Sequence, residues 1–271
     1  MNKPITAIFL FFYFLQSLVH TQACTIFIAN DGRTVWVGNN EDNTTATRHR
    51  LWYYPAHKNT YGYMTWTELY GGKLLHGLAY LFPQGGMNEH GLFMDYTAIE
   101  NLPAQTDPAK QNRKKEVVRD VLKKCKSVEE ALAYIKQYNL PRLTGAQLFI
   151  ADATGDYAIV HGSFVERKKT PNFALTNYPV HNGRQEKCWR REAAQAALSN
   201  TKPYALDDIK GILERTAQRD EDDIVTNYSM AINLNTRTIH LYCQRDFTKN
   251  VVISLQNELK NGKKHKNLSK Y

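Results

Sequence analysis

The sequence lacks the features that mark several large classes of protein. It has four cysteines in 271 residues, and no two of them form a Cys-x-x-Cys pair. A small exported domain held together by disulfides would contain many more, so this class is excluded. No stretch rich in proline, glycine and serine divides the chain, and no repeat period is visible. These absences favour one large domain and exclude a repeat architecture.

Motifs for metal and nucleotide chemistry are also missing. The nine histidines are scattered singly, with no His-Glu-x-x-His segment. A zinc hydrolase would normally group such ligands. No glycine-rich loop followed by lysine is present to hold phosphates. We therefore expect no metal ion and no other cofactor.

The formal net charge of +9 at first suggests a nucleic-acid partner. Much of this charge lies in Lys3 and in a basic tail, residues 260–271, and the chain between them is only mildly basic. We therefore expect no nucleic-acid partner. A frayed, solvated terminus is the simpler interpretation of residues 260–271, and loose attraction to an anionic surface is the alternative.

Residues 1–23 have the pattern of an export signal. Lys3 provides a positive start, residues 7–15 are an unbroken apolar run, and Thr21-Gln22-Ala23 ends on a small residue. A membrane-spanning helix needs about 18 or more consecutive apolar residues, whereas Gln16 interrupts this run early. We expect cleavage after Ala23, no integral membrane span, and a periplasmic or secreted protein. A retained anchor is the alternative.

Alternating apolar residues on either side of turn sequences predict four β-hairpins. Their turns are Asp31-Gly32, Asn88-Glu89-His90-Gly91, Thr154-Gly155-Asp156 and Asn235-Thr236. Helical periodicity predicts helices over residues 114–124, 127–138, 185–198 and 205–218, the second opened by a Ser127-x-x-Glu130 capping box. Paired strands and clustered helices predict an α+β fold with layered antiparallel sheets and helices on their outer faces.

One segment, residues 43–68, is rich in Tyr, Trp and Thr and shows no clear period. We predict a long loop that lines a pocket. Its aromatic residues suggest a substrate with an apolar acyl group or a ring.

Cleavage after Ala23 would make Cys24 the first residue of the working chain. A cysteine nucleophile needs a base, since the free thiol has a pKa of about 8.5. The α-amine of the same residue has a pKa of about 7.7 to 8.0, so it is a suitable base. Two other interpretations of Cys24 stay open: an inert strand cysteine, or the lipid attachment point of a surface protein that only binds ligands. For lipid attachment, Thr21 stands where a branched apolar residue is expected.

Four segments then carry a resemblance to a known family. They are Cys24-Thr25, Gly38-Asn39-Asn40-Glu41-Asp42, Gly86-Met87-Asn88-Glu89-His90-Gly91-Leu92 and Leu175-Thr176-Asn177-Tyr178-Pro179. In this order they resemble the choloylglycine hydrolase superfamily, the N-terminal-nucleophile amidases that include bile salt hydrolases, penicillin V acylases, acid-ceramidase-like amidases and the isopenicillin-N acyltransferase type. The resemblance covers nearly all of the expected domain, residues 24–259. It implies a four-layer αββα fold and cleavage of a linear C–N amide bond in a small N-acyl amide.

The resemblance also implies roles for four residues. Cys24 matches the nucleophile, Asp42 the aspartate that orients the free amine, and Asn177 the asparagine whose side-chain amide holds the oxyanion. Arg190 matches the site arginine, with its neighbour Arg191 as the alternative. Plainer interpretations are turn residues for Asp42 and Asn177, and a solvated helix position for Arg190.

Three departures from the family pattern limit what the resemblance implies. Asn39 stands where the family has arginine, so one cation near the thiol is missing and bile-acid specificity does not carry over. Thr97 or Ala98 stands where a further asparagine is expected. Asn43 opens an Asn-x-Thr sequence whose glycosylation would obstruct the site. The oligomeric state, including a homo-oligomer, and the choice of water or an amine as acyl acceptor stay open.

Overall fold

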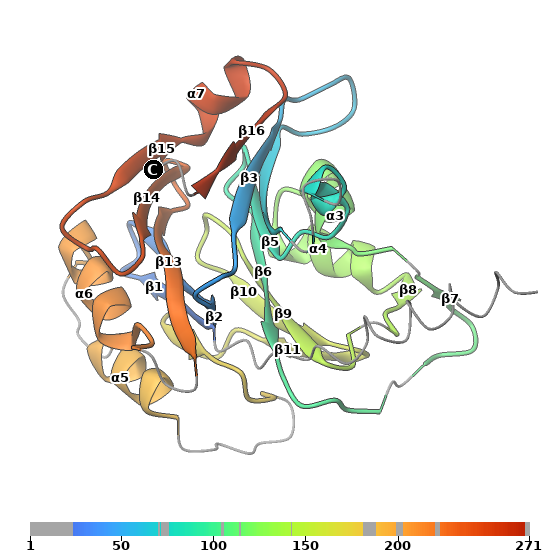
Figure 1. The fold of residues 1–271 in the computed structure, drawn as a ribbon. Helices are drawn as coiled ribbons and strands as arrows, with labels where there is room; N and C mark the ends of the chain where they lie inside the picture. The colour runs from blue at the N-terminus through green and yellow to red at the C-terminus, as the bar shows by residue number, and fades with distance from the viewer. Residues whose placement is uncertain are drawn as a thin grey trace, which may run out of the picture.

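Two antiparallel sheets pack face to face, with helices on the outer face of each (Figure 1). This account concerns the part of the chain that the computed structural model describes, which is residues 24–69, 71, 76–103, 106–113, 115–141, 143–180, 188–198, 203–219 and 223–268. The order of layers is helix, sheet, sheet, helix. The predicted α+β, four-layer αββα architecture is therefore confirmed.

The smaller sheet has six strands, and the larger has eight. The six-stranded sheet has the order β12 (Phe173–Leu175), β1 (Thr25–Asn30), β2 (Val35–Thr44), β13 (Ile224–Asn233), β14 (Thr238–Cys243), β15 (Val251–Ser254). The eight-stranded sheet has the order β11 (Phe164–Arg167), β10 (Tyr157–His161), β9 (Ala146–Ala151), β6 (Phe93–Ala98), β5 (Gly85–Asn88), β4 (Tyr63–Glu68), β3 (His49–Tyr54), β16 (Lys264–Asn267). A short parallel pair is formed by β7 (Gln111–Asn112) and β8 (Tyr138–Asn139). All four predicted hairpins form, as β1–β2, β5–β6, β9–β10 and β13–β14.

The helices lie in the two outer layers and at one rim. They are α3 (Val118–Lys124) and α4 (Val128–Ile135) on the eight-stranded sheet, α5 (Trp189–Leu198) and α6 (Leu206–Thr216) on the six-stranded sheet, α7 (Leu255–Lys260) after β15, and the short 3-10 helix η1 (Ala79–Leu81). The four predicted helices are thus confirmed with shorter bounds, although residues 114 and 185–187 of the predictions lie outside the described residues. Ser127 caps α4 as predicted, because its Oγ accepts from the Glu130 N–H at 3.2 Å.

The prediction of a long loop over residues 43–68 is wrong. The end of β2 and the whole of β3 and β4 occupy this segment. Tyr53 and Trp66 face the layer between the sheets, whereas Trp52 and Tyr63 face the outer side. Strands covered on both faces do not need alternating polar and apolar residues. Residues 43–68 therefore lack the period of two that predicts a strand. An apolar cavity of about 240 Å³ lies elsewhere, with Phe82, Tyr96, Leu140 and Leu143 in its lining.

The basic tail is also more ordered than predicted. Lys264–Asn267 form β16, which pairs with β3 at the edge of the eight-stranded sheet. The Lys264 and Lys266 amines lie 2.7 and 3.0 Å from the Glu258 carboxylate of α7. The interpretation of residues 264–267 as a frayed terminus is therefore wrong. The number of basic residues in the sequence does not show that Glu258 of α7 pairs with them.

The layer between the sheets changes character along the strands. On β1 and β2, Ile28, Val35 and Val37 belong to an apolar core, whereas Asn39 and Glu41, further along β2 on the same face, are polar and equally buried. The eight-stranded sheet repeats the change, since the apolar Phe93 of β6 is followed two residues later by buried Asp95. Residues two apart share a strand face. The polar side chains therefore gather at one end of the layer, and this is where Cys24 lies.

Gly38 is required where β1 and β2 pair. A Cβ atom at this position would lie 2.1 Å from the Phe27 ring. Phe27 is directly opposite Gly38 in the register and is fully buried beneath α5 and α6. The missing side chain thus lets an aromatic ring anchor the strand that begins at Cys24.

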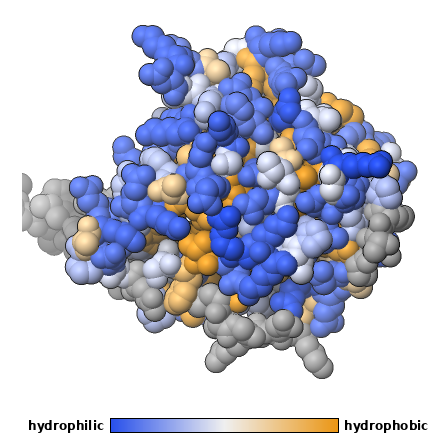
Figure 2. Space-filling model, turned by 180° about the vertical axis from the view of Figure 1, so that it is seen from behind, coloured by the Kyte–Doolittle hydropathy of each residue, from blue (hydrophilic) through white to orange (hydrophobic). Residues whose placement is uncertain are grey.

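The face shown in Figure 2 is mostly hydrophilic, with apolar residues gathered in limited areas. Among the described helices, none combines the length and apolar character needed to cross a bilayer.

His49 should make the fold sensitive to acid. Burial lowers the pKa of His49 to about 3, whereas an unfolded histidine titrates near about 6.5. Between these values the unfolded chain binds a proton that the folded chain does not, so stability should decrease as pH falls through this range, by up to about 1.4 kcal/mol per pH unit. Urea unfolding from pH 7 to 4 should show a weaker pH dependence in His49→Gln than in the unmodified protein. His57→Gln, at an exposed turn, is the matched control, and an equal slope in all three proteins would contradict the assignment.

Candidate active site

Cys24 lies directly before β1, with its thiol between the two sheets. Ile26 and Ile28 face this layer and Phe27 faces the helices, so alternation directs Cys24 inward. The residue is 1% exposed. Burial, followed by the charges of Glu41 and Asp42, raises the pKa of the Cys24 thiol well above its usual range. A preformed thiolate is therefore disfavoured in this environment.

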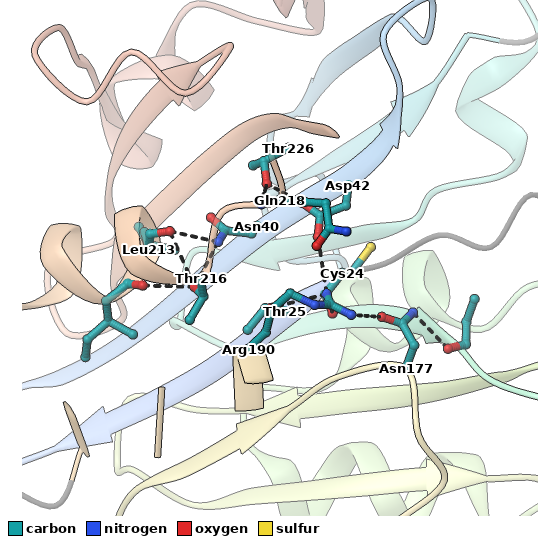
Figure 3. A network of polar contacts seen from close by, with 12 residues as sticks. Cys24, Thr25, Asn40, Asp42, Asn177, Arg190, Leu213, Thr216, Gln218 and Thr226 are labelled. Carbon is teal, nitrogen blue, oxygen red and sulfur yellow. Dashed lines mark hydrogen bonds and ion pairs between the residues drawn. The ribbon is translucent and has the colours of Figure 1, made fainter. Parts of the chain in front are cut away.

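Arg190 connects the other three residues that the sequence singled out (Figure 3). It lies in the first turn of α5 and is 7% exposed. Its Nη1 lies 3.0 Å from the Cys24 carbonyl oxygen and 3.2 Å from Asp42 Oδ2. Its Nη2 donates to Asn177 Oδ1 at 3.3 Å. Three chain segments distant in sequence are therefore fixed around one guanidinium. Arg191, the alternative, instead lines a cavity beside β10, β11 and β12.

Asp42 is fully buried at the end of β2. Its carboxylate contacts Arg190 on one oxygen and accepts a short hydrogen bond from Thr226 Oγ1 on the other. Burial raises the pKa of Asp42 to about 7, and Arg190 and Thr226 oppose that rise. A register shift between Thr226 and Tyr228 sets Thr226 opposite Asp42 and Tyr228 opposite Glu41. This bulge aligns both pairs.

Asn177 follows β12 and lies beside the start of β1. Its Nδ2 donates to the Ala98 carbonyl at 2.9 Å, and its Oδ1 accepts from Arg190. Two partners thus fix the plane of the amide. Ala98, considered in the sequence as a place for a further asparagine, takes part through its main chain. Thr97, the residue before Ala98 on β6, is fully buried.

Gln147 holds the segment that carries Asn177, a contact that no local sequence pattern predicts. Its Nε2 donates to the carbonyls of Thr176 and Tyr178, each at 2.9 Å, and its Oε1 accepts from the Val180 N–H at 3.3 Å. Gln147 is fully buried on β9, so it ties the eight-stranded sheet to a loop of the six-stranded one. Only the pairing of distant strands brings these groups together.

A group of buried carboxylates near the thiol was also missed. Glu41 contacts the Cys24 thiol, and Asp95 lies across the layer on β6. Asn39 donates to Asp95 Oδ2 at 2.8 Å, so the residue that replaces the family arginine is bonded to a carboxylate. Asn43 is buried and donates to Glu68, which argues against a glycan at this position. The available sequence signal was the placement of Asn39 and Glu41 on one face of β2.

None of the four cysteines forms a disulfide. Within the described ranges, no three His, Cys, Asp or Glu side chains are grouped so that they could hold a metal ion.

Comparison with known proteins shows which family the chain belongs to. The family model of acyl-coenzyme A:6-aminopenicillanic acid acyl-transferase matches residues 28–187. The chain belongs to this family. The match includes Asp42 and Asn177 and ends just before Arg190, and Cys24 lies just ahead of it. No curated protein matches the chain.

Solved structures share the fold of this chain. Two variants of the conjugated bile acid hydrolase from Clostridium perfringens each have a TM-score of 0.67 and 14% identity, covering 90% of this chain and 96% of theirs. Penicillin V acylase from Agrobacterium tumefaciens has a TM-score of 0.62 and 16% identity, covering 90% of both chains. The expected choloylglycine hydrolase superfamily is confirmed. Membership of the acyl-transferase family supports an enzyme of amide hydrolysis or acyl transfer.

Replacing Gln147 tests how the Asn177 segment is held. Gln147→Ala would leave the two carbonyls and the Val180 N–H without their buried partner, so Asn177 should lose its fixed position. We expect kcat to fall by about 10-fold with a smaller change in KM, since a slight misplacement of a positioned group can reduce the rate strongly. Gln137→Ala, an exposed glutamine just after α4, is the matched control. Unchanged kcat in a folded Gln147→Ala protein would show that the segment needs no such support.

Proposed function

We propose that this protein is an exported hydrolase that cleaves a linear, non-peptide C–N amide bond through Cys24 as its N-terminal residue. The observation that carries the proposal is the Arg190 network, which links the Cys24 main chain, the Asp42 carboxylate and the Asn177 amide. These are a nucleophile, an orienting acid and an oxyanion donor within one buried site. The family assignment supports the same class of chemistry.

In the first half of the reaction, the Cys24 sulfur attacks the amide carbonyl carbon, and the thiol proton passes to the Cys24 α-amine. The raised pKa of the thiol favours such a transfer during attack over a preformed thiolate. The developing oxyanion takes a hydrogen bond from Asn177 Nδ2, whose plane Arg190 and Ala98 fix. Because these donors are already oriented, little reorganisation is needed.

In the second half, the C–N bond breaks and the leaving amine takes the proton from the α-ammonium. A thioester then joins the acyl group to Cys24. Water attacks this thioester and gives a proton to the α-amine. The C–S bond then breaks, the sulfur takes that proton back as the thiol, and the acid is released. Asp42 suits the task of holding the ammonium form between the two halves, since its buried carboxylate is itself fixed by Arg190 and Thr226.

The position of Cys24 favours this proposal over a lipid-anchored binding protein. The thiol lies between two packed sheets and beside Glu41, and the residue is almost wholly buried. A diacylglyceryl group on that sulfur would have to displace the packed layer. An acylated α-amine would also no longer act as the base.

The nucleophile is tested by Cys24→Ala, which should reduce turnover by about 10³-fold or more while thermal unfolding stays unchanged. The substrate panel should contain bile acid conjugates, N-acyl homoserine lactones, penicillin V, N-acylethanolamines and short peptides, and products should be identified with and without added amines. A new amide in place of free acid would identify an acyltransferase. Cys125→Ala, a buried thiol at the end of α3, is the control.

Mass spectrometry of the purified protein tests independently whether Cys24 is the N-terminal nucleophile. The active form should begin at Cys24 with an unmodified amine. Full activity in protein that keeps any residue before Cys24, or that carries a blocked amine, would rule out the proposed base.

Asn177→Ala should lower kcat by about 10² to 10³, because one preorganised oxyanion donor is lost. The change in KM should be much smaller. Asn261→Ala, an exposed asparagine after α7, controls for the substitution itself. A kcat within a few-fold of the unmodified enzyme would mean that Asn177 serves only to position Arg190.

A further inference from the structure

The environment of the thiol is unusually acidic. Thr25 pairs with Asn40 across β1 and β2, so Cys24 and Glu41 come next to each other in this register. The Glu41 carboxyl is close enough to the Cys24 thiol to interact with it. Any substrate whose carbonyl carbon reaches that sulfur must therefore come against the Glu41 carboxyl as well. Glu41 is 1% exposed, so this contact takes place away from bulk water.

Two further carboxyl groups, those of Glu68 and Asp95, lie near Glu41. Gln84 Nε2 donates to Glu41 Oε1 at 2.9 Å and to Glu68 Oε1 at 2.7 Å, which ties these two acids together. Asp95, fully buried on β6, is the largest charge acting on Glu41. Burial first, and then the charge of Asp95, raises the pKa of Glu41 well above its usual range.

Within the described part of the chain, no lysine or arginine contacts Glu41 or Asp95. Their hydrogen-bond partners are neutral groups, among them Asn39 and Trp66 on Asp95. The arginine of the site, Arg190, is directed to Asp42 instead. Buried carboxylates are normally paired with a cation. Because burial raises the pKa values of Glu41 and Asp95, a cation beside them would be needed to hold both in the ionised form.

The hydroxyl of Tyr228 is aimed into the same space. Tyr228 stands directly opposite Glu41 in the β13–β2 register, with its side chain in the layer between the sheets. It is 1% exposed, and its hydroxyl has no hydrogen-bond partner. Glu41, Asp95 and Cys24 are all close enough to act on its pKa. A hydroxyl can accept a hydrogen bond from an ammonium group, as the carboxylates can.

A cavity of about 670 Å³ adjoins these residues. Its lining includes Thr226 and Tyr228, the partners of Asp42 and Glu41 in the sheet. Arg48 and Arg245 also line it and are exposed. Of Cys24, Glu41, Asp95 and Tyr228, only Tyr228 is among the lining residues of this cavity.

We propose that the site accepts N-acyl amides that carry an ammonium group within a few bonds of the scissile bond, and that Glu41 and Asp95 bind this cation with Tyr228 as a further acceptor. The inference rests on the proposed function and names its substrate class. An organic cation fits better than a metal ion, because the described acids are not grouped as metal ligands.

The test compares substrates that differ only by ammonium against methyl. On the acyl side, glycyl, β-alanyl and 4-aminobutyryl p-nitroanilides are paired with propionyl, butyryl and valeryl p-nitroanilides. On the amine side, N-butyryl-ethylenediamine is paired with N-butyryl-propylamine. In at least one pair, kcat/KM at pH 7 should be about 30-fold or more higher for the ammonium member, since a buried charge pair is lost in its partner. The two arms show which side carries the cation.

Variants then locate the cation. Glu41→Gln and Asp95→Asn keep the size of each side chain and should each reduce that ratio by about 10-fold or more. Glu129→Gln, an exposed acid of α4, should leave the ratio unchanged. The ratio is the measured quantity, because Glu41 contacts the nucleophile and its replacement alters turnover of every substrate. Equal rates within every pair, or faster cleavage of the methyl members, would overturn the inference while leaving the hydrolase proposal intact.

A binding measurement keeps the two proposals separable. Calorimetry with Cys24→Ala should show the ammonium member of the preferred pair binding about 30-fold or more tightly than its methyl partner. If the processed protein turns over no amide, the proposed function is wrong. The binding measurement then tests the proposed cation site by itself. Equal binding of the two members, or no binding of either, would overturn it.

Discussion

The site depends on one buried interaction, the guanidinium of Arg190 among oxygen atoms of three other chain segments. Its partners come from the start of β1, the end of β2 and the loop after β12. The helix that carries Arg190 is held in place by the packing of Ala194 and Leu198 against the six-stranded sheet. Without Arg190, Asp42 would be a buried and poorly compensated charge, which typically costs about 3 to 5 kcal/mol. Fold and site are therefore stabilised by the same contact.

The same strands build the apolar core and the polar site. Along β2 the residues that face the other sheet change from Val35 and Val37 to Asn39 and Glu41. No separate loop is needed to position these groups, since the strands are fixed by packing at their apolar end. A site built on such rigid elements holds its geometry more precisely than one built on loops. The cost is desolvation, seen in the raised pKa values of Cys24, Glu41 and Asp95.

Family membership and substrate choice rest on different residues. The αββα frame and the Asp42 and Asn177 motifs place the chain among acyl-transferring and amide-cleaving enzymes. The same frame serves different substrates, so specificity must be argued from the site itself. Here the distinctive residues are Asn39, bonded to Asp95, and Glu41, beside the thiol. They make the surroundings of the nucleophile acidic where the family pattern would place a cation.

Local patterns in the sequence determined much of the fold. Turn residues between alternating strands predicted four hairpins, because such signals lie within a few neighbouring positions. The resemblance of the motifs around Cys24, Asp42 and Asn177 to a known family singled out the residues that meet in the structure. Tertiary structure alone decided the rest. In the structure Arg190, and not Arg191, contacts Cys24. Residues 43–68 form strands covered on both faces. Gln147, Glu41 and Asp95 lie at the site. Those outcomes depend on pairing between segments far apart in the chain, and side chains that meet only across two packed sheets leave no mark in local periodicity.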